Sequence, residues 1–533
     1  MSNGQPEQNT KTYTINRMHL HTTNLPGQPV NITSLYQKLT IEENIFKPFI
    51  EGSLTIFDGA GYQEIFPIMG EEHLELDIIS SFDDFLNETP RRIRGLFRIY
   101  NVTPMNTIGS QPGKAFTLDF ISEQYFQNLR TKVHYSTIDK KQTLSRIVKT
   151  IYENYIKFSE SNYDDDMAAG YRKDIEIENT LRNYQIIFPN VSPYQAILMC
   201  AKRSISKDTS KKGASFLFYE EFEKFHFKSL ESIQQEPEKF ILVYIPNLDD
   251  KTKIDEVYSR NQTADFDFIY IDNYQINRSF DVMENMSQGM YSSKLITHDF
   301  ERMQYHEYDF EYVPKLDFTV KTIKRDGKDV RVIKKTNPNS NDVIVDRSKA
   351  VARGKLTTTL NDMLNHPDQK VHLTSTTLNH DIVFDVNQSE PGGYEQKGIE
   401  PKDIEKYFLQ RNSQIQQFDN VKVEVALRNS NTKIKVGDVV KFNLPSDIDP
   451  GQMTVPDTHF YYSGNYVVSK VVHSMSGTEG LATTITICKN GLEHSMPAFN
   501  DEVRKVLGQL DRQTTTGKES TLSNPEDYVE DGR

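Results

Sequence analysis

Carboxylate pairs are the first residues in this chain whose type and spacing could support chemistry. Glu220 and Glu221 follow the aromatic run Phe216-Leu217-Phe218-Tyr219, and two carboxylates at a strand end could serve as general acid and base. The chain holds 75 acidic residues, however, so adjacent pairs are expected without any function. We therefore predict that Glu220 and Glu221 form a charged hairpin turn.

Histidines form two further candidate sites. His19 and His21 would share one face of a strand and could ligate a metal ion, but no third ligand is identifiable. His298, Asp299 and His306 form a looser cluster, and a solvated strand face is the favoured interpretation of both groups. Acidic residues 164–166 could bind calcium, but the glycine that an EF-hand loop requires does not follow them. No metal site is predicted.

Glycine-rich turns resemble nucleotide-binding loops only superficially. Residues 109–115 (GSQPGKA) are one residue short of a phosphate loop, and Ala115 lacks the hydroxyl that would bind magnesium. Gly59-Ala60-Gly61 lacks the third glycine of a dinucleotide fingerprint. Neither an H-E-x-x-H helix nor a G-x-S-x-G nucleophile elbow occurs. We predict no catalytic residue, no cofactor and no enzymatic activity.

The composition limits the architecture that could position such residues. With 533 residues the chain is too long for one compact core, and three or four domains are expected. The net charge of −13 lacks the basic excess of a nucleic-acid binder. No run of about eighteen apolar residues predicts a membrane span, and the N-terminus shows no secretory signal. Cys200 and Cys488 are expected to be buried free thiols.

Residues 12–121 form the first predicted domain, which is all-β. Residues 73–78 alternate polar and apolar side chains, as in a strand that buries one face. Turn signals at Asp58-Gly59 and Pro112-Gly113 separate the strands, and such frequent turns are typical of a small antiparallel barrel or sandwich. The strands are expected at residues 39–45, 53–57, 73–79, 95–102 and 115–121.

Residues 122–313 form a predicted α+β middle region. Apolar residues between 144 and 156 recur at the spacing of one helix face. A second helix is expected to begin with Ser192 as N-cap and Pro193 in the first turn, before a hairpin of strands at 215–219 and 225–227. Residues 265–272 and 294–300 could be strands or short helices, and the region could contribute strands to a second barrel.

Three segments complete the predicted organisation. Residues 314–415 form an expanded insertion or decoration region, with a hairpin of residues 318–323 and 330–333 around Asp326-Gly327. Residues 416–499 form the second β-barrel segment, with strands expected at 421–427, 439–444, 465–473 and 481–488. Residues 500–533 form a charged C-terminal tail, in which residues 501–510 could be a short helix.

The order of several motifs resembles the baseplate hub proteins of contractile-tailed, T4-like bacteriophages. The first motif is a helix that opens with Asn190-Val191-Ser192-Pro193, followed by the strands FLFYE and FHFKSL. No single motif is diagnostic; their order carries the resemblance, which extends over most of the chain outside residues 314–415. The other matching segments are residues 36–79, 98–102, 115–122, 127–130, 280–285, 289–291, 295–299, 434–440 and 464–468.

This resemblance implies a mainly β fold with two tail-tube-like antiparallel β-barrel domains plus intervening α+β domains. It implies a homotrimer whose six barrel positions adapt a threefold central spike to a sixfold tail tube. The expected partners are the central spike protein trimer, the tail tube protein ring, the tape-measure protein and the surrounding baseplate wedge proteins. Viral DNA would pass through the channel without specific binding. The protein would reside in the virion, in the phage tail baseplate, without membrane insertion.

Two other functions remain open. The chain could be a hub or spike component of a contractile injection or type VI secretion-like system, whose spikes usually continue into a needle of β repeats. The sequence printed here ends at Arg533 without such repeats, so the phage hub is the expected machine. A tail-associated cell-wall hydrolase is the alternative from another class, and Glu220 and Glu221 would be its candidate residues.

Overall fold

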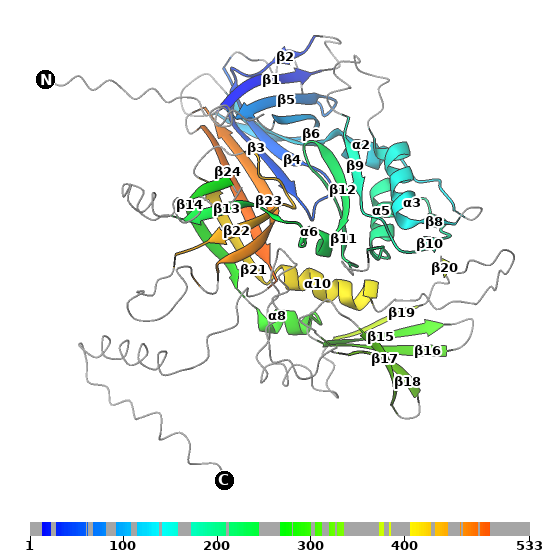
Figure 1. Cartoon of the computed structure of the whole chain (residues 1–533). Helices are drawn as coiled ribbons and strands as arrows, with labels where there is room; N and C mark the ends of the chain where they lie inside the picture. Colours follow the sequence, from blue (N-terminus) through cyan, green and yellow to red (C-terminus); the bar gives the residue numbers. More distant parts are fainter. Residues whose placement is uncertain are drawn as a thin grey trace, which may run out of the picture.

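The computed structural model of this chain contains two β-barrels, an α+β unit between them in sequence, and a separate five-stranded sheet (Figure 1). The structure describes residues 13–22, 28–59, 61, 68–80, 92–107, 114–137, 141–157, 172–208, 213–244, 267–279, 281–290, 292–299, 304–311, 319–325, 328–334, 372–377, 383–384, 406–427, 432–445, 459, 462–477 and 480–490.

The first barrel is antiparallel throughout, and its strands pair in the order β2-β1-β5-β6-β7-β4-β3. The strand expected at residues 73–79 is confirmed as β5, but the prediction that it buries only one face is wrong, because Glu75 and Asp77 are buried as well as Leu74, Leu76 and Ile78. Across the remaining seam, the hydroxyls of Tyr13 on β1 and Tyr36 on β3 form a hydrogen bond. The strands are β1 (Tyr13–His21), β2 (Val30–Asn31), β3 (Tyr36–Asn44), β4 (Glu51–Asp58), β5 (His73–Ser80), β6 (Arg92–Thr107) and β7 (Lys114–Ser122).

The second barrel is a closed ring of six strands. In ring order they are β22 (Val439–Asn443), β13 (Glu238–Tyr244), β14 (Asp267–Ser279), β21 (Val421–Leu427), β24 (Gly480–Lys489) and β23 (Gly464–Ser476), and β23 pairs with β22 again. The middle region therefore supplies two strands, and the undecided residues 265–272 lie largely in β14. This barrel is mixed, because β13 runs parallel to both of its neighbours.

The α+β unit packs helices against a small aromatic sheet. The predicted amphipathic helix is confirmed as α3 (Leu144–Ile151), which continues as the π-helical turn η2 (Tyr152–Ile156). The helix at Ser192 is also confirmed: the Ser192 and Gln195 side chains form a reciprocal capping box at the start of α5. The unit also contains α2 (Glu123–Arg130), α5 (Pro193–Ala201), α6 (Leu230–Ile233), β8 (Gln142–Thr143), β9 (Asp174–Ile177), β10 (Asn183–Tyr184), β11 (Phe216–Glu220) and β12 (Lys224–Ser229).

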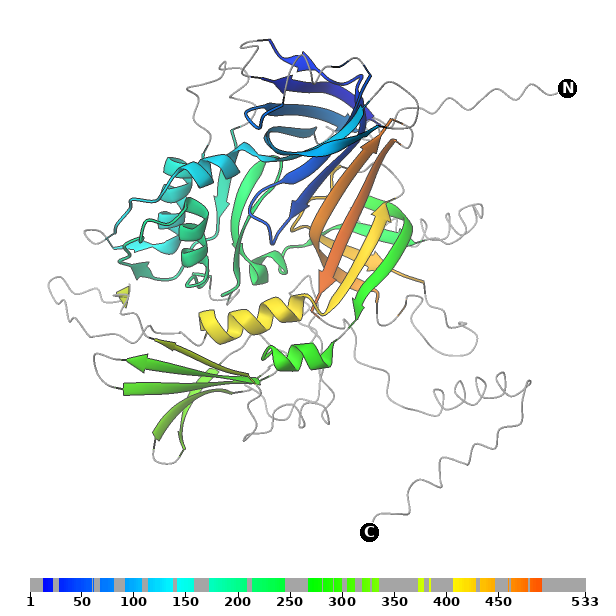
Figure 2. The ribbon, with the colours of Figure 1, turned by 180° about the vertical axis from the view of Figure 1, so that it is seen from behind.

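The five-stranded sheet lies below the barrels, and two short helices separate it from them in both views (Figures 1 and 2). The predicted hairpin at 318–333 is confirmed as β17 and β18, although its turn at Asp326-Gly327 lies outside the described residues. The sheet consists of β15 (Ser292–Asp299), β16 (Gln304–Glu311), β17 (Thr319–Arg325), β18 (Lys328–Lys334) and β19 (His372–Thr377), and the helices are α8 (Val282–Ser287), η4 (Lys406–Gln410) and α10 (Arg411–Phe418). The short strand β20 (Val383–Phe384) pairs instead with β10 of the α+β unit.

The mainly β class with an α+β middle region is thus confirmed. Residues 294–300, which were undecided, lie largely in β15, and the possible helix at 501–510 lies outside the described residues. Each barrel has its own apolar core, and a third core fills the α+β unit. Both cysteines are buried free thiols, as expected, and burial raises the pKa of each to about 12.

Candidate functional site at the barrel junction

One long strand belongs to both barrels. Residues 464–467 at the start of β23 pair with β22 and close the second barrel, whereas residues 470–476 pair with β3 of the first barrel. Its other edge pairs with β24, with a register shift between Val468 and Lys470. At this bulge the Ser469 carbonyl accepts a hydrogen bond from Ile45 N at 3.0 Å. The bulge lies where β23 leaves one barrel and joins the other.

The turn between β11 and β12, residues 220–223, lies beside this shared strand and is called the junction turn below. Glu220, the first residue of the turn, is also the last residue of β11, in which all five residues are buried. Its carboxylate is therefore placed inside the protein. Glu220 is 1% exposed and Glu221 is 2% exposed. The predicted charged hairpin turn is present, since Glu220 pairs with Phe225 and Glu221 N donates to the Lys224 carbonyl at 2.9 Å, but both carboxylates are buried where three units of the chain converge.

Glu220 connects the α+β unit to the first barrel. Its carboxylate accepts hydrogen bonds from Ile50 N at 2.9 Å, the Ser122 hydroxyl at 2.7 Å and the Lys173 ammonium at 2.7 Å. Ile50 directly precedes β4, and Ser122 is the last residue of β7. The buried Lys173 also donates to the Glu221 carbonyl at 3.0 Å. Because charge and hydrogen-bond donors meet inside the protein, the Glu220 carboxylate is compensated without water.

The rest of the junction turn contacts both barrels. Glu221 pairs with His226 Nε2 at 2.8 Å and with Lys435 Nζ at 2.7 Å, and Lys435 leads into the second barrel. Phe222 N donates to the Glu43 carboxylate on β3 at 3.0 Å. The Phe222 ring packs on the His473 imidazole of β23, with ring centroids 6.2 Å apart. The junction turn thus fixes the α+β unit against both barrels at the strand that they share.

Tyr219 links this network to a tight turn of the second barrel. Its ring stacks on His226 at 4.8 Å between centroids, and burial raises its pKa well above the ordinary value. A Cβ atom on Gly437 would lie 2.7 Å from the Tyr219 hydroxyl, and Gly437 has a φ of 84°. Gly437 N donates to the Val468 carbonyl at 2.8 Å, beside the bulge in β23. Only glycine combines that backbone conformation with this close approach.

The predicted metal-ligand candidates are engaged differently. His19 and His21 lie on one face of β1, where both contact the buried carboxylate of Glu75 at 3.5 Å and 3.0 Å; Arg17 also pairs with it. No group of histidine, cysteine and acidic side chains that could hold a metal ion occurs among the described residues. His298, Asp299 and His306 lie on the paired strands β15 and β16, but their side chains, like residues 164–166, fall outside the described residues.

The described residues of the two glycine-rich segments lie at the start of a strand and in a turn. Of residues 109–115, only Lys114 and Ala115 are described, at the start of β7. Gly61 has a φ of 75°, a conformation that suits a turn.

Among the described helices, none combines the length and the apolar composition that a membrane crossing requires.

Sequence reasoning missed the partners of the junction turn, among them Ser122, Lys173, Glu43 and Lys435. One signal could have pointed to them. The aromatic-rich hairpin FLFYEEFEKFHF contains three glutamates, two of them directly after the apolar strand, and acidic residues in a buried strand require nearby cations and donors. Which cations these are depends on contacts across many tens of residues, and no local pattern encodes them.

No protein-family model matches this sequence, and no curated protein matches it. Among solved structures, the chain is similar to a tail protein from Neisseria meningitidis, with 8% identity over 90% of this chain and 96% of that one and a TM-score of 0.43. It is similar to the 43 kDa tail protein of prophage MuSo2 from Shewanella oneidensis, with 9% identity, coverage of 89% and 98%, and a TM-score of 0.43.

A chain of the Francisella PdpA-VgrG complex is also similar, at 12% identity and a TM-score of 0.36. The match covers 92% of this chain but 54% of that longer one. These likenesses are too distant in sequence and in TM-score to assign a role to this chain.

Proposed function

We propose that this protein is a structural hub of a contractile phage tail, in which three copies form a pseudo-sixfold ring. One observation carries this proposal: a single chain holds two barrels that are joined edge to edge through the shared strand β23. Two barrels in each of three copies provide six barrel positions. In such a ring the three chains are related by threefold symmetry, and the six barrels are related by approximate sixfold symmetry. The ring can therefore join a threefold spike to a sixfold tube.

The junction turn supports this role mechanically. A ring of six barrels requires a fixed angle between the two barrels of each chain, since a flexible linker would let them separate. Here Glu220 holds Ile50 and Ser122 of the first barrel, and Glu221 holds Lys435 of the second. A buried network of paired charges allows little rotation, because any displacement leaves a charge without a partner.

In this assembly the proposed partners are the central spike trimer, the tail tube ring, the tape-measure protein and the baseplate wedge proteins. The proposed location is the virion, in the tail baseplate. Three copies would bring a net charge of 3 × −13 = −39 to the ring. An acidic channel wall repels the phosphate backbone, and viral DNA would therefore pass through without specific binding.

We propose no catalytic role for the acidic pair that the hydrolase alternative required. Both carboxylates are buried and engaged with neighbouring side chains, and a polysaccharide could not reach them in this arrangement. Turnover of peptidoglycan by the purified protein, lost in Glu220→Gln or Glu221→Gln variants, would contradict this assignment.

The proposal is tested by the mass and shape of the purified full chain. Light scattering is expected to give three times the 61.6 kDa of one chain, and electron-microscope class averages are expected to show a ring of six lobes around a hole. If the protein alone stays monomeric, the same measurements are repeated with the spike trimer added. Failure to form a ring in both conditions would overturn the proposal.

A further inference from the structure

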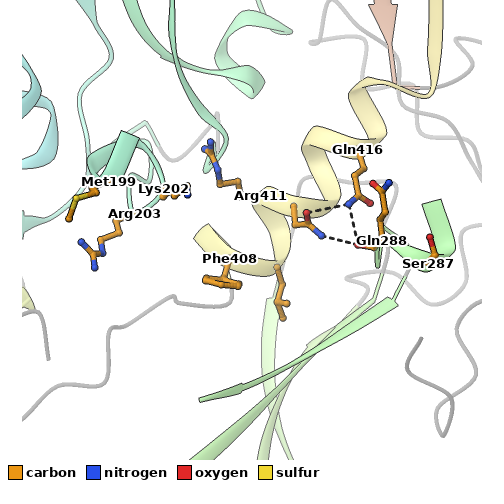
Figure 3. Close-up of a pocket in the computed structure, with 10 residues that line it drawn as sticks. Met199, Lys202, Arg203, Ser287, Gln288, Phe408, Arg411 and Gln416 are labelled. Carbon is orange, nitrogen blue, oxygen red and sulfur yellow. Dashed lines mark hydrogen bonds between the residues drawn. The ribbon is translucent and has the colours of Figure 1, made fainter. Parts of the chain in front are cut away.

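A groove with a cationic lining lies at the meeting point of three elements outside the barrel junction. It has a volume of about 780 Å³ and is bounded by the end of α5, the end of α8, and the continuous helix made by η4 and α10 (Figure 3). Figure 3 shows Met199, Lys202 and Arg203 on one side and Ser287 and Gln288 on the other. The hub role proposed above does not involve this groove.

The wall of the groove is a built structure. The Arg411 guanidinium donates to the carbonyls of Ala214 at 3.4 Å and Phe216 at 2.9 Å, which anchors α10 to the α+β unit. On the opposite side the Gln288 carbonyl accepts hydrogen bonds from Asn412 at 3.0 Å and Gln416 at 3.1 Å (Figure 3). These contacts fix α10 to the β11 segment of the α+β unit on one side and to the end of α8 on the other.

The chemistry of the lining selects for an acidic ligand with an apolar anchor. Its charged residues are Lys202, Arg203 and Arg411, and none of the lining residues that the structure describes is acidic. This local excess of positive charge contrasts with the net charge of −13 of the whole chain. Met199 and Phe408 add apolar surface, and Phe408 is 37% exposed. A peptide with carboxylates on both sides of an aromatic residue complements such a surface in charge and in hydrophobicity.

The chain itself contains such a peptide. Residues 525–531 read Pro-Glu-Asp-Tyr-Val-Glu-Asp, so that four carboxylates flank Tyr528 and Val529. We propose that this acidic segment docks into the groove of its own chain. Tyr528 would supply the apolar anchor against Met199 and Phe408, and the carboxylates would face Lys202, Arg203 and Arg411.

The point at which the chain leaves the described part supports this assignment. Lys489 on β24 pairs with Val421, three residues after α10 ends, and the Asn490 side chain accepts a hydrogen bond from Gln234 at 3.0 Å. Arg411 in the groove lies seven residues before Phe418 on the same helix, which is a distance of about 10 Å along the helix axis. The 35 residues from Asn490 to Pro525 span roughly 35 Å as a flexible chain, and this is ample reach.

The test measures the distance from the tail to the groove in the full chain. Nitroxide labels are placed on Ser287→Cys and Gly532→Cys, and both native thiols stay unlabelled because they are buried. Docking predicts a narrow, short distance distribution by pulsed electron paramagnetic resonance. The distribution is expected to broaden between 0.05 and 1 M salt, as charges become screened.

Charge reversal provides the matched comparison. The exposed Lys202→Glu is expected to lower the docking equilibrium about fivefold, within the range for exposed charge pairs. Lys149→Glu, an exposed reversal on α3 with a side chain that is 60% exposed, is expected to leave it unchanged. Replacing all four tail carboxylates by their amides should abolish the short distance without changing the thermal stability of the barrels.

Three results would overturn the proposal. The first is a broad distribution that does not respond to salt or to Lys202→Glu. The second is an equal response to Lys202→Glu and Lys149→Glu, which would show a non-specific charge effect. The third is loss of the short distance when labelled protein is diluted with excess unlabelled protein, because the tail would then dock on a second copy.

Discussion

At the residue scale, Glu220 concentrates the energetics of the junction. It is a buried carboxylate with three donors from three separate segments, at residues 50, 122 and 173. A buried ion pair contributes little net stability relative to an apolar pair, but removal of one partner leaves an uncompensated charge. Glu220 therefore favours one arrangement of the first barrel and the α+β unit, because a displaced arrangement would leave its buried charge without partners.

A double-mutant cycle tests this account. Glu220→Gln is expected to lower the free energy of unfolding by about 3–5 kcal/mol, because the Lys173 ammonium loses its buried partner. Glu220→Gln combined with Lys173→Met should cost less than the sum of the two single changes. Urea titration at pH 7 measures all four proteins. The control is Glu223→Gln, whose side chain is 55% exposed and pairs with Lys435; its cost should stay below about 1 kcal/mol. Additive single changes would contradict the account.

At the element scale, the decisive feature is the bulge in β23. The residues before the bulge close one barrel and those after it extend another, so a continuous strand serves two sheets. The turn that contains Gly437 supports the bulge from outside, because Gly437 N binds the Val468 carbonyl and Val468 N binds the Asp438 carbonyl, both at 2.8 Å. The geometry of this one turn thus determines where the strand changes partner.

Gly437→Ala is expected to destabilise the protein by about 1–3 kcal/mol. Two effects contribute: a side chain at a φ of 84° is strained, and the new Cβ would approach the Tyr219 hydroxyl. The matched control is Gly477→Ala, where an added Cβ meets nothing within 4 Å, and its effect should lie within about 0.5 kcal/mol. Thermal and urea unfolding of both variants provide the measurement. Equal effects of the two changes would show that the Gly437 turn bears no strain.

The hairpin β11-β12 and its neighbour β9 carry a predicted acid sensitivity. Burial alone would raise the pKa of Glu176, but hydrogen bonds from Lys224 and Lys228 outweigh it and lower the pKa to about 2. A carboxylate with a lowered pKa stabilises the fold fully above its ordinary value of 4.5 and loses that contribution as the pH falls toward 2.

The stability difference between the wild-type protein and Glu176→Gln is therefore expected to be constant from pH 7 to about 5 and to shrink between about 4.5 and 2. Urea midpoints measured across this range test the expectation, with Glu153→Gln, at an exposed pair with Lys149, as the control. A difference that grows on acidification would have the wrong sign for a lowered pKa.

At the scale of the whole molecule, the trimer that we propose would require an apolar surface between copies. Tyr100 on β6 of the first barrel is 53% exposed, Leu129 on α2 of the α+β unit is 54% exposed, and these two elements are in contact. Exposed large apolar side chains are favoured at subunit interfaces, and we take the exposed surface of β6 and α2 as the candidate interface face. A fixed angle between the barrels would present this face in the same orientation on every copy.

Tyr100→Lys combined with Leu129→Lys is expected to weaken trimer formation by more than tenfold while the monomer keeps its unfolding midpoint. Buried lysine charge at an interface opposes association, whereas both positions face solvent in the single chain. Analytical ultracentrifugation over a range of concentrations gives the association constant. Ile187→Lys, at a side chain that is 63% exposed on the α+β unit, is the control. Equal trimer affinity in all variants would exclude this face as the interface.

The sequence by itself determined the elements of this protein. Turn signals and apolar runs predicted many of the barrel strands, such as β7 and β21, the apolar period predicted α3, and Ser192-Pro193 predicted the start of α5, because each signal acts within a few residues. Tertiary structure alone decided that β13 joins β22 some 200 residues later, that β23 serves two barrels, and that Glu220 is buried. These outcomes depend on contacts between segments far apart in the chain, and a local sequence pattern does not specify which distant segments will meet.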